Sequence, residues 1–484
     1  MEKTRARYQN IGLFLGPFLA ALVLVLPPAE GISLEAWWVV AMVVWMAAWW
    51  ATEAIPVPAT SLIPLVFLPV MGITTMQEAA APFAHSVIFL LLGGFLMAMA
   101  LQRWNLHRRI ALTILSKTKD QPATLIGGFM VTAAMLSMWI SNTATTIMMV
   151  PIAISMARAV STDKENRRVF TIALLLGLAY AASIGGFGTL IGTPPNAMVR
   201  GYLELTHNIT ISFTDWMLLG VPMVIVLLPI AWFILTRFVF PMKNFSGKNG
   251  KKFILDELEK MGPITTPEKR IAMVFGFIAF SWITRPLFKE FTDFSFFENL
   301  SDTNIAIFGA LLMFLIPAGL KDKKGATLLN WDWAVKLPWG VLLLFGGGLS
   351  MAAAIEATGL SMWLGESLSS LTTFHLFFLI GGLVTLVVFL TELTSNTATT
   401  AALLPVLGAI AFASGLDPIL LAAPMALAAS CAFMLPVATG PNAIVFSSGK
   451  VPIPQMSRAG FWVNIAAILV LSTMCYALVP LIFT

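Results

Sequence analysis

The sequence predicts an all-α polytopic membrane protein built from inverted-topology repeats, with two re-entrant helical hairpins and broken helices. Composition is the first indication: 58% of the 484 residues are hydrophobic and only 11% are charged, against roughly 25% charged residues in soluble domains. The second is the hexapeptide Ser-Asn-Thr-Ala-Thr-Thr, which occurs at 141–146 and again at 395–400, each time inside a long apolar stretch. The third is the charge of the loops, which predicts that the two copies enter the membrane from opposite faces.

Residues 1–35 are predicted to hold a short basic segment and the first transmembrane helix. Lys3, Arg5 and Arg7 precede an apolar stretch at 11–26, and lysine and arginine mark the cytoplasmic side of a membrane helix. No A-x-A cleavage pattern follows this stretch and further apolar runs begin at once, which favours a retained helix over a signal peptide. The N-terminus is therefore predicted to be cytoplasmic.

Residues 36–241 are predicted to form the first repeat. Two segments rich in lysine and arginine, 103–119 and 158–168, flank the first copy of the hexapeptide. Because both segments are expected in the cytoplasm, the chain between them at 122–159 has to enter and leave by the same face. It is therefore predicted to be a re-entrant hairpin with the hexapeptide at its tip. A broken helix is predicted at 169–205, because Gly-Thr-Pro-Pro-Asn interrupts the apolar run there.

A basic cytoplasmic linker is predicted at 242–270 and the second repeat at 271–484. In the second repeat, three lysines mark the loop at 321–324 as cytoplasmic, whereas the segments on either side of the second hairpin contain no lysine or arginine. The hairpin at 376–414 is therefore predicted to enter from the outside. Its broken helix is predicted at 417–449, where Ala-Thr-Gly-Pro-Asn echoes the first interruption. The C-terminus is predicted to be extracytoplasmic.

The two hairpin tips are candidate sodium sites. Na⁺ is a hard cation that neutral hydroxyl, amide and carbonyl oxygens can coordinate, whereas Mg²⁺ and Ca²⁺ favour carboxylates. Ser137 and Ser141 are four positions apart, so they share one helix face if this arm is helical. The candidate ligands are Ser137, Ser141, Asn142 and carbonyls between 185 and 192 in the first repeat, and Thr391, Ser395, Asn396 and carbonyls near Ala438 in the second.

The same motifs carry groups that suit an anion. Amide nitrogens and hydroxyls are hydrogen-bond donors, and the N-termini of the helices that follow each break, near Ala144, Pro194, Ala398 and Pro441, add partial positive charge. No arginine or lysine lies within these motifs. A bound dianion would therefore depend on bound cations for charge compensation, which predicts obligatory coupling. The candidate substrate ligands are Asn142, Thr143, Thr193, Asn396, Thr397 and Thr439.

Other functions and roles compete with this interpretation. Small hydroxyl residues also serve tight helix packing in membranes, but two copies at hairpin tips, each with a later Pro-Asn break, favour a site. A membrane-embedded enzyme is disfavoured because the sequence has no H-E-x-x-H, G-x-S-x-G or Walker A motif. A channel is disfavoured because two opposed hairpins suit occlusion better than a continuous pore. No basic, aromatic-interleaved stretch suggests a nucleic-acid partner.

Three intramembrane carboxylates are left out of the predicted site. Glu53, Glu356 and Glu392 lie in or beside apolar runs, and a hydrogen-bonded structural role suits them at least as well as a functional one. Segments 103–119 and 330–335 have the pattern of interfacial amphipathic helices. They are predicted to be surface helices or arms between moving and fixed parts.

Several motifs together carry a resemblance to a known family: Thr-Glu-Ala-Ile-Pro at 52–56, Gly-Thr-Pro-Pro-Asn at 192–196, Pro-Val-Ala-Thr at 436–439 and the paired Ser-Asn-Thr tips. The chain resembles the divalent anion/sodium symporters, the INDY group of di- and tricarboxylate carriers, and looks most like their bacterial sodium–dicarboxylate members. The resemblance implies a homodimer in the inner (plasma) membrane, in contact with membrane lipid, whose transport domain slides past a scaffold domain as an elevator. It implies symport of Na⁺ with succinate, malate or fumarate. A cation-independent exchanger, or a carrier of citrate or sulfate, is the alternative.

By motif, the resemblance also implies ligand roles for particular positions. It implies one Na⁺ at Ser137, Ser141, Asn142 and Gly192, a second at Thr391, Ser395, Asn396 and Ala438, and substrate carboxylates at Asn142, Thr143, Thr193, Asn396, Thr397 and Thr439. One departure is Gly440, where the family usually has proline. Glycine permits backbone geometry that proline forbids, and it removes a ring contact with substrate.

Overall fold

The computed structural model describes residues 6–160, 163–242, 249–291, 298–320, 325–367 and 374–483, and the regular secondary structure in these ranges is helical. Ten helical segments among the described residues are long and apolar enough to cross a membrane. The predicted all-α, multi-pass membrane fold is therefore confirmed. Lys3, Arg5 and the lysines of the 321–324 loop, on which part of the predicted orientation depends, lie outside the described residues.

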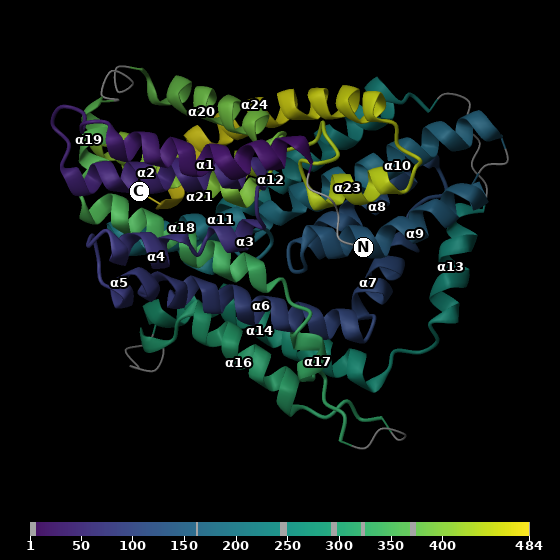
Figure 1. Cartoon of the computed structure of the whole chain (residues 1–484). Coiled ribbons are helices and arrows are strands. Elements are labelled where there is room, and N and C mark those ends of the chain that lie inside the picture. The colour runs from purple at the N-terminus through teal and green to yellow at the C-terminus, as the bar shows by residue number, and fades with distance from the viewer. Residues whose placement is uncertain are drawn as a thin grey trace.

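The first half of the chain forms long helices interspersed with short pieces (Figure 1). Its helices are α1 (Arg7–Val25), α2 (Leu34–Thr52), α3 (Val57–Thr60), α4 (Ile63–Val70), α5 (Met76–Ala80), η1 (Ala81–Ala84), α6 (Ser86–Arg103), α7 (Leu106–Leu115), α8 (Pro122–Ser137), α9 (Asn142–Val160), α10 (Lys164–Gly185), η2 (Gly186–Gly188), α11 (Pro194–His207), α12 (Phe213–Phe233) and η3 (Ile234–Val239).

The second half repeats much of this order. Its helices are α13 (Gly250–Lys260), α14 (Thr266–Phe291), α16 (Asp302–Leu315), α17 (Trp331–Ala334), α18 (Trp339–Ala357), α19 (Leu360–Ser367), α20 (Leu376–Thr391), α21 (Asn396–Ala413), α22 (Ile419–Ala429), α23 (Gly440–Ser447) and α24 (Ile453–Phe483).

Two helical hairpins share one design. Residues 138–141 join α8 to α9, and residues 392–395 join α20 to α21. The first arms, α8 and α20, are both 16 residues long. The second arms begin with the asparagines of the repeated hexapeptide, whose backbone carbonyls accept hydrogen bonds from Thr146 Oγ1 and Thr400 Oγ1 at 2.8 Å. The hexapeptide therefore supplies the first residue of each second arm and a hydroxyl that bonds back onto its first turn.

Two helices are interrupted at the motifs that predicted a break. Residues 186–193 separate α10 from α11, and residues 430–439 separate α22 from α23. Interruption frees backbone carbonyls at membrane depth, and these need donors. Asn196 Nδ2 donates to two carbonyl oxygens of the first break at 2.9 and 2.8 Å, and Asn442 Nδ2 donates to two of the second break at 3.0 Å each. The asparagine of each Pro-Asn motif thus stabilises the break that precedes it.

The helices pack in two groups. In the first group α8 and α9 pack on α10, α9 also packs on α23, and α11 and α21 pack on α22. Figure 1 shows α8, α9, α10 and α23 together in its right-hand part. In the second group α6 and α14 pack on α16, along the lower edge of that view. α11 of the first group contacts α6 of the second, so it lies where the two groups meet.

The short helix α7 is tied to the chain that links the two halves. Arg108 Nη2 lies 2.8 Å from Glu257 on α13, and Arg109 Nε lies 2.7 Å from Glu268 on α14. The hydrogen bond from Lys260, together with the charges of Lys260 and Arg108, lowers the pKa of the Glu257 carboxyl. Because charged hydrogen bonds are stronger than neutral ones, these pairs hold α7 firmly against the linker.

A buried ion cluster joins α11 to α14 and α16. The side chain of Asp302, at the start of α16, lies 2.9 Å from Arg200 Nη1 on α11 and 2.9 Å from Arg285 Nε on α14. Its Oδ2 also accepts a hydrogen bond from the backbone amide of Phe213 at 2.9 Å. Removing one partner of such a buried pair leaves an uncompensated charge and is strongly destabilising. This cluster therefore links the two packing groups by polar contacts.

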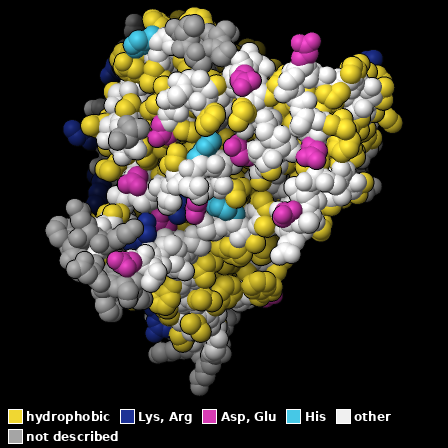
Figure 2. Space-filling view, turned by 90° about the vertical axis from the view of Figure 1, so that its left-hand side faces the viewer, with side chains coloured by type: hydrophobic (Ala, Val, Ile, Leu, Met, Phe, Trp, Pro, Cys, Tyr) yellow, Lys and Arg dark blue, Asp and Glu magenta, His cyan; other side chains and the backbone are white. Residues whose placement is uncertain are grey.

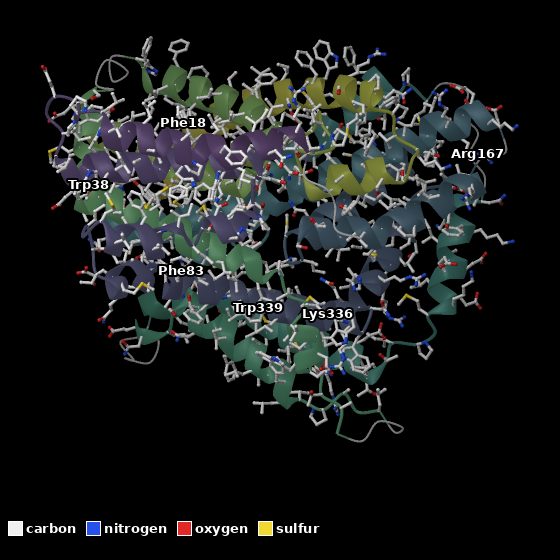
Figure 3. All side chains as sticks on the ribbon, in the orientation of Figure 1. Phe18, Trp38, Phe83, Arg167, Lys336 and Trp339 are labelled. Atoms are coloured by element: carbon white, nitrogen blue, oxygen red, sulfur yellow. The ribbon has the colours of Figure 1, made fainter. Side chains whose placement is uncertain are left out.

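Charge differs between the two ends of the molecule. Figure 2 views the left-hand side of Figure 1, and carboxylates are scattered over that face while lysines and arginines lie mostly at its edges. Arg167, near the start of α10, lies instead at the right-hand edge of Figure 3. Carboxylates therefore occur over the face that Figure 2 shows, and Arg167 lies at the other end of the helix bundle.

Candidate functional site

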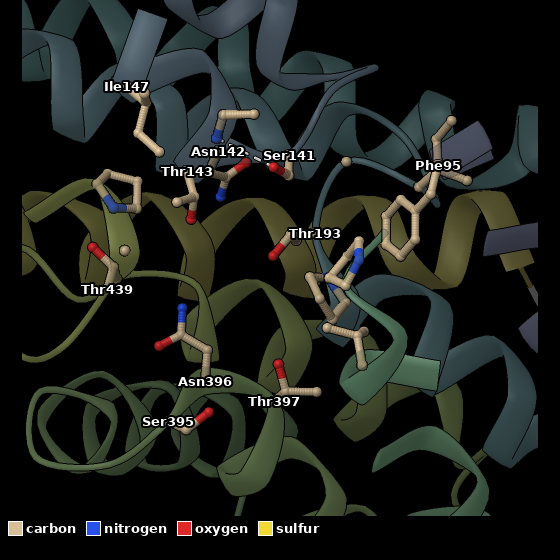
Figure 4. A pocket seen from close by; sticks show the side chains of 18 of the residues that line it. Phe95, Ser141, Asn142, Thr143, Ile147, Thr193, Ser395, Asn396, Thr397 and Thr439 are labelled. Carbon is tan, nitrogen blue, oxygen red and sulfur yellow. Dashed lines mark hydrogen bonds between the residues drawn. The ribbon is translucent and has the colours of Figure 1, made fainter. Parts of the chain in front are cut away.

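A cavity of about 730 Å³ lies between the hairpin tips, the helix breaks and a wall contributed by α6 and the α17–α18 connection. Figure 4 shows Ser141, Asn142 and Thr143 of the first hairpin on one side of it, and the corresponding residues 395–397 of the second hairpin on the other. Pockets of roughly 300–1,000 Å³ typically bind small molecules. Two motifs that are 254 positions apart in the sequence therefore face one shared space.

The cavity brings together most of the residues that the sequence predicts for the site. Ser137 and Thr391 do not line it; they lie buried behind its wall, in contact with the asparagines in front of them. The predicted residues that line it are Ser141, Asn142, Thr143, Gly192, Thr193, Ser395, Asn396, Thr397, Ala438 and Thr439.

Oxygen atoms converge behind the first tip. Ser137 Oγ lies 2.6 Å from the side-chain amide of Asn142. The same end of that amide is 3.2 Å from the carbonyl oxygens of Ala182 and Gly192. Either the amide turns its NH₂ group toward these three oxygens and donates to them, or its own oxygen faces them and all four share a cation. This group of neutral oxygens fits the preference of Na⁺ for hydroxyl, amide and carbonyl ligands.

The second tip repeats the arrangement. Thr391 Oγ1 donates to Asn396 Oδ1 at 2.7 Å and also lies 2.9 Å from the carbonyl oxygen of Ala429. The hydroxyl residue again precedes the asparagine by five positions and belongs to the last turn of the first arm. Both half-sites therefore place a buried hydroxyl and an amide together, with two backbone carbonyls at the first tip and one at the second, and without a carboxylate ligand.

Four helices begin at the cavity. The first residues of α9, α11, α21 and α23 are Asn142, Pro194, Asn396 and Gly440, and each of them lines the cavity. The sequence predicts these N-termini within two residues of their positions in the structure, near Ala144, Pro194, Ala398 and Pro441. A helix N-terminus carries unpaired amide groups and about half a positive charge, so it favours a bound anion. Four such ends around one space provide anion-binding character without a lysine or arginine in the motifs.

The remaining wall was not predicted. Phe95, Met99 and Gln102 of α6 line the cavity, as do Trp333 and Lys336. Lys336 Nζ lies 4.1 Å from the centre of the Trp333 ring, a cation–π geometry. The sequence marks 330–335 as amphipathic, but it does not show which cavity the segment faces, because that contact joins residues distant in the chain.

The three carboxylates that the sequence leaves out have different surroundings. Glu53 is the left-handed C-cap of α2 (φ 45°) and lines the cavity. Glu356 is exposed near the end of α18 and is absent from the cavity lining. Glu392 is buried at the second hairpin tip, where four N–H groups donate to its carboxylate. The sequence does not separate these three glutamates, whereas their burial and hydrogen bonds in the structure do.

Gly440 is in close contact with the first hairpin. A Cβ atom at this position would overlap Thr143 Oγ1. Thr143 belongs to the first repeat and Gly440 to the second, so the two half-sites meet at this point. The departure from the proline that the family usually has therefore lies in the wall of the cavity itself.

The chain is similar to known membrane transporters over almost its whole length. The family model described as the sodium:sulfate symporter transmembrane region matches residues 8–483. The sodium-dependent dicarboxylate transporter SdcS of Staphylococcus saprophyticus is 42% identical over 481 residues, which is 98% of this chain and 92% of that protein. The protein of the same name from Staphylococcus aureus is 41% identical over 482 residues, with the same shares covered.

Among solved structures, the YdaH transporter of Alcanivorax borkumensis superposes with a TM-score of 0.63 at 13% sequence identity, covering 98% of this chain and 99% of that one. At this identity the likeness concerns the fold alone. The match of the family model over almost the whole chain, together with relatives above 40% identity, shows that the chain belongs to the sodium:sulfate symporter family of membrane transporters.

Proposed function

We propose that this protein is a secondary active symporter that couples Na⁺ influx to the uptake of C4-dicarboxylates such as succinate, malate and fumarate. The observation that carries the proposal is the pair of neutral-oxygen clusters, one at each hairpin tip, beside a single cavity ringed by four helix N-termini. The staphylococcal relatives are named sodium-dependent dicarboxylate transporters. Their names support both the ion and the substrate class.

The electrostatics of the cavity explain why the two solutes travel together. The hairpin and break motifs contain no lysine or arginine, so their donors to a dianion are helix N-termini, amides and hydroxyls. Lys336 lies on the other wall of the cavity, over the Trp333 ring, and one such cation would not balance two negative charges. The two negative charges of a dicarboxylate need nearby positive charge when the substrate enters a site of reduced dielectric constant. Na⁺ bound in the clusters of Asn142 and Asn396 supplies that compensation, so the cations bind first and build the site that receives the dicarboxylate.

Alternating access follows from the two packing groups. The transport domain consists of the hairpins and broken helices of the two inverted repeats, 36–241 and 271–484, which the linker 242–270 joins. The scaffold domain contains α6, α14, α16 and α18 and forms the contact between two copies in a homodimer. The transport domain slides against the scaffold as an elevator and carries the cavity across the membrane. The cavity is lined by the hairpin tips on one side and by α6 on the other, which supports this division into a transport domain and a scaffold domain.

The loop charges support an orientation in the inner (plasma) membrane. The basic end that holds Arg167 faces the cytoplasm, and the acidic face of Figure 2 faces outward, as the positive-inside rule predicts. The C-terminus then lies outside, since Figure 1 marks it in the left-hand part of the molecule. The cavity takes its α6 residues from Phe95 to Gln102, the half of that helix next to Arg103. The cavity therefore lies nearer the cytoplasmic end of α6 in this orientation, which supports a cytoplasm-facing conformation.

Removal of the paired amides tests the proposal. In proteoliposomes with an inward Na⁺ gradient, Asn142→Ala and Asn396→Ala are expected to abolish succinate uptake, because each removes a cation ligand and a substrate donor. Asn10→Ala is the matched control, because Asn10 is exposed on α1 far along the chain from both hairpins. It should transport as the unchanged protein does. Uptake at the unchanged rate by both hairpin variants would reject the site.

Ion replacement separates this function from its alternatives. With K⁺ in place of Na⁺, uptake should stop; uptake driven by internal dicarboxylate alone would identify an exchanger instead. The family model is described by sulfate, so unlabelled sulfate and citrate are the competitors to compare with succinate. Competition by sulfate but not by succinate would assign the carrier to the inorganic anion.

A further inference from the structure

Glu392 is a buried carboxylate at the tip of the second hairpin, with 3% of its surface exposed. Its Oε1 accepts hydrogen bonds from the backbone amides of Phe433 and Met434 at 2.7 and 2.9 Å, and Oε2 accepts one from Leu435 at 3.0 Å. Asn464 Nδ2 of α24 donates to Oε1 at 2.8 Å. An ionised carboxylate only accepts hydrogen bonds, so four N–H donors fit the charged form.

The three amides belong to the second helix break. Asn442 holds the same turn from its carbonyl side, since Nδ2 donates to the oxygens of Ala432 and Leu435. In a trans peptide the N–H and C=O groups point in opposite directions. Glu392 therefore fixes which way the carbonyls of this turn face. The same break continues into Ala438 and Thr439, which line the cavity.

The first repeat lacks this carboxylate. Met138 stands at the equivalent position, 254 residues before Glu392, and contributes its backbone carbonyl as the acceptor for Thr189 Oγ1. Asn196 holds the first break as Asn442 holds the second. The two half-sites therefore match in their asparagines but differ by one buried negative charge.

We propose that Glu392 is a positioning residue for the second half-site and makes it the tighter of the two Na⁺ sites. This rests on the proposed Na⁺ coupling and extends it, because it makes the two sites unequal. The carboxylate holds the turn that leads to Ala438. Among the described residues, no lysine, arginine or histidine pairs with this carboxylate. Glu392 is next to Thr391 in the chain, so its negative charge favours a cation in the neighbouring oxygen cluster.

Thermal unfolding of the purified full-length protein measures this without transport. NaCl replaces KCl at constant ionic strength with no dicarboxylate present, and the rise in melting temperature reports Na⁺ binding. The midpoint is taken as the Na⁺ concentration that gives half of a fixed reference rise in melting temperature, since stabilisation grows with the logarithm of ligand concentration. Glu392→Gln is expected to raise this midpoint roughly tenfold or more, as loss of charge-assisted hydrogen bonds predicts. An unchanged midpoint in a variant that still unfolds cooperatively would overturn the proposal.

Two backgrounds test which half-site Glu392 serves. In Ser141→Ala, which weakens the first half-site, Glu392→Gln should keep its full effect on the midpoint. In Ser395→Ala, which weakens the second, it should have little further effect, because residues that act through one site are not additive. Equal shifts in both backgrounds would indicate a general loss of packing and contradict the assignment.

A second variant covers the case in which Glu392→Gln does not fold. Asn464→Leu keeps the carboxylate and its three amide donors and removes one hydrogen bond, so the midpoint should rise in the same direction by a smaller factor. No shift in Asn464→Leu would count against Glu392. If the unchanged protein is stabilised equally by Na⁺ and K⁺, the proposed Na⁺ coupling itself is wrong, which is a separate outcome.

Discussion

At the scale of single residues, the site depends on hydroxyl–asparagine pairs. Ser137 and Thr391 each lie five positions before an asparagine and contact its side-chain amide from behind the cavity wall. The sequence predicts these residues because a repeated polar motif in an apolar chain needs hydrogen-bond partners or a bound ligand. It does not predict that they act through Asn142 and Asn396 rather than facing the cavity, because the depth of a side chain depends on how the hairpin arms pack.

Gly440 is the residue whose replacement most directly tests the junction of the two half-sites. In Gly440→Ala the new methyl group would meet Thr143 Oγ1 and displace this donor from the cavity. Overpacking of this kind typically costs about 1–3 kcal/mol, so the concentration of succinate for half-maximal uptake should rise roughly tenfold. Titration of uptake with succinate at saturating Na⁺ measures the change.

Gly382→Ala is the matched control for that change. Gly382 lies in α20, the first arm of the second hairpin, and a Cβ atom there would meet nothing within 4 Å. The control should leave the succinate dependence as it is. If Gly440→Ala also leaves it unchanged, the contact between Thr143 and Gly440 has no part in substrate binding.

At the scale of elements, breaks are easier to predict than partners. Proline, glycine and asparagine mark the N-terminal ends of α11 and α23 in the sequence. In the structure a break precedes each of these two helices. The donors that satisfy each break, Asn196 and Asn442, lie within the motifs, but their role was not predicted. The α6 and Lys336 side of the cavity could not be read from the chain either, since its contacts span long sequence separations.

The Arg200–Asp302 pair is expected to stabilise the proposed cytoplasm-facing arrangement. It lies at the opposite end of α6 from the cavity, because Thr303, next to Asp302, donates to the carbonyl of Ser86 at the start of that helix. If α11 moves past α16, this pair must break. Arg200→Met should therefore shift the protein toward outward-facing states, and labelling of a Val437→Cys reporter from the cytoplasmic side should slow several-fold, about tenfold for each 1.4 kcal/mol.

Val437 is a suitable reporter, since it lines the cavity and is 81% exposed. Arg285→Met is the control, because Arg285 pairs with the same Asp302 carboxylate but from α14, within the proposed scaffold. It should leave the labelling rate of the reporter nearly unchanged. Equal slowing by both arginine variants would show that the effect comes from an exposed or misfolded Asp302 region and not from release of α11.

At the scale of the whole molecule, the fold class follows from composition and repetition, and the helices bear it out. What the sequence leaves open is how the two repeats are arranged, because the inversion depends on loop charges. Part of those charges, at Lys3, Arg5 and 321–324, lies outside the described residues. Arg167 belongs to the segment 158–168 used for that prediction, so its place at the edge of Figure 3 adds the arrangement in space but no new charge.

Single-cysteine labelling tests the inverted arrangement directly. The native Cys431 and Cys475 are buried, so an impermeant maleimide should react only with a cysteine introduced at the surface. Arg158 and Phe374 are exposed at the open ends of the first and second hairpins. If the hairpins enter from opposite faces, Arg158→Cys should be labelled only from the cytoplasmic side and Phe374→Cys only from the outside. Labelling of both from one side would exclude inverted repeats, and with them two half-sites that meet across the membrane midplane.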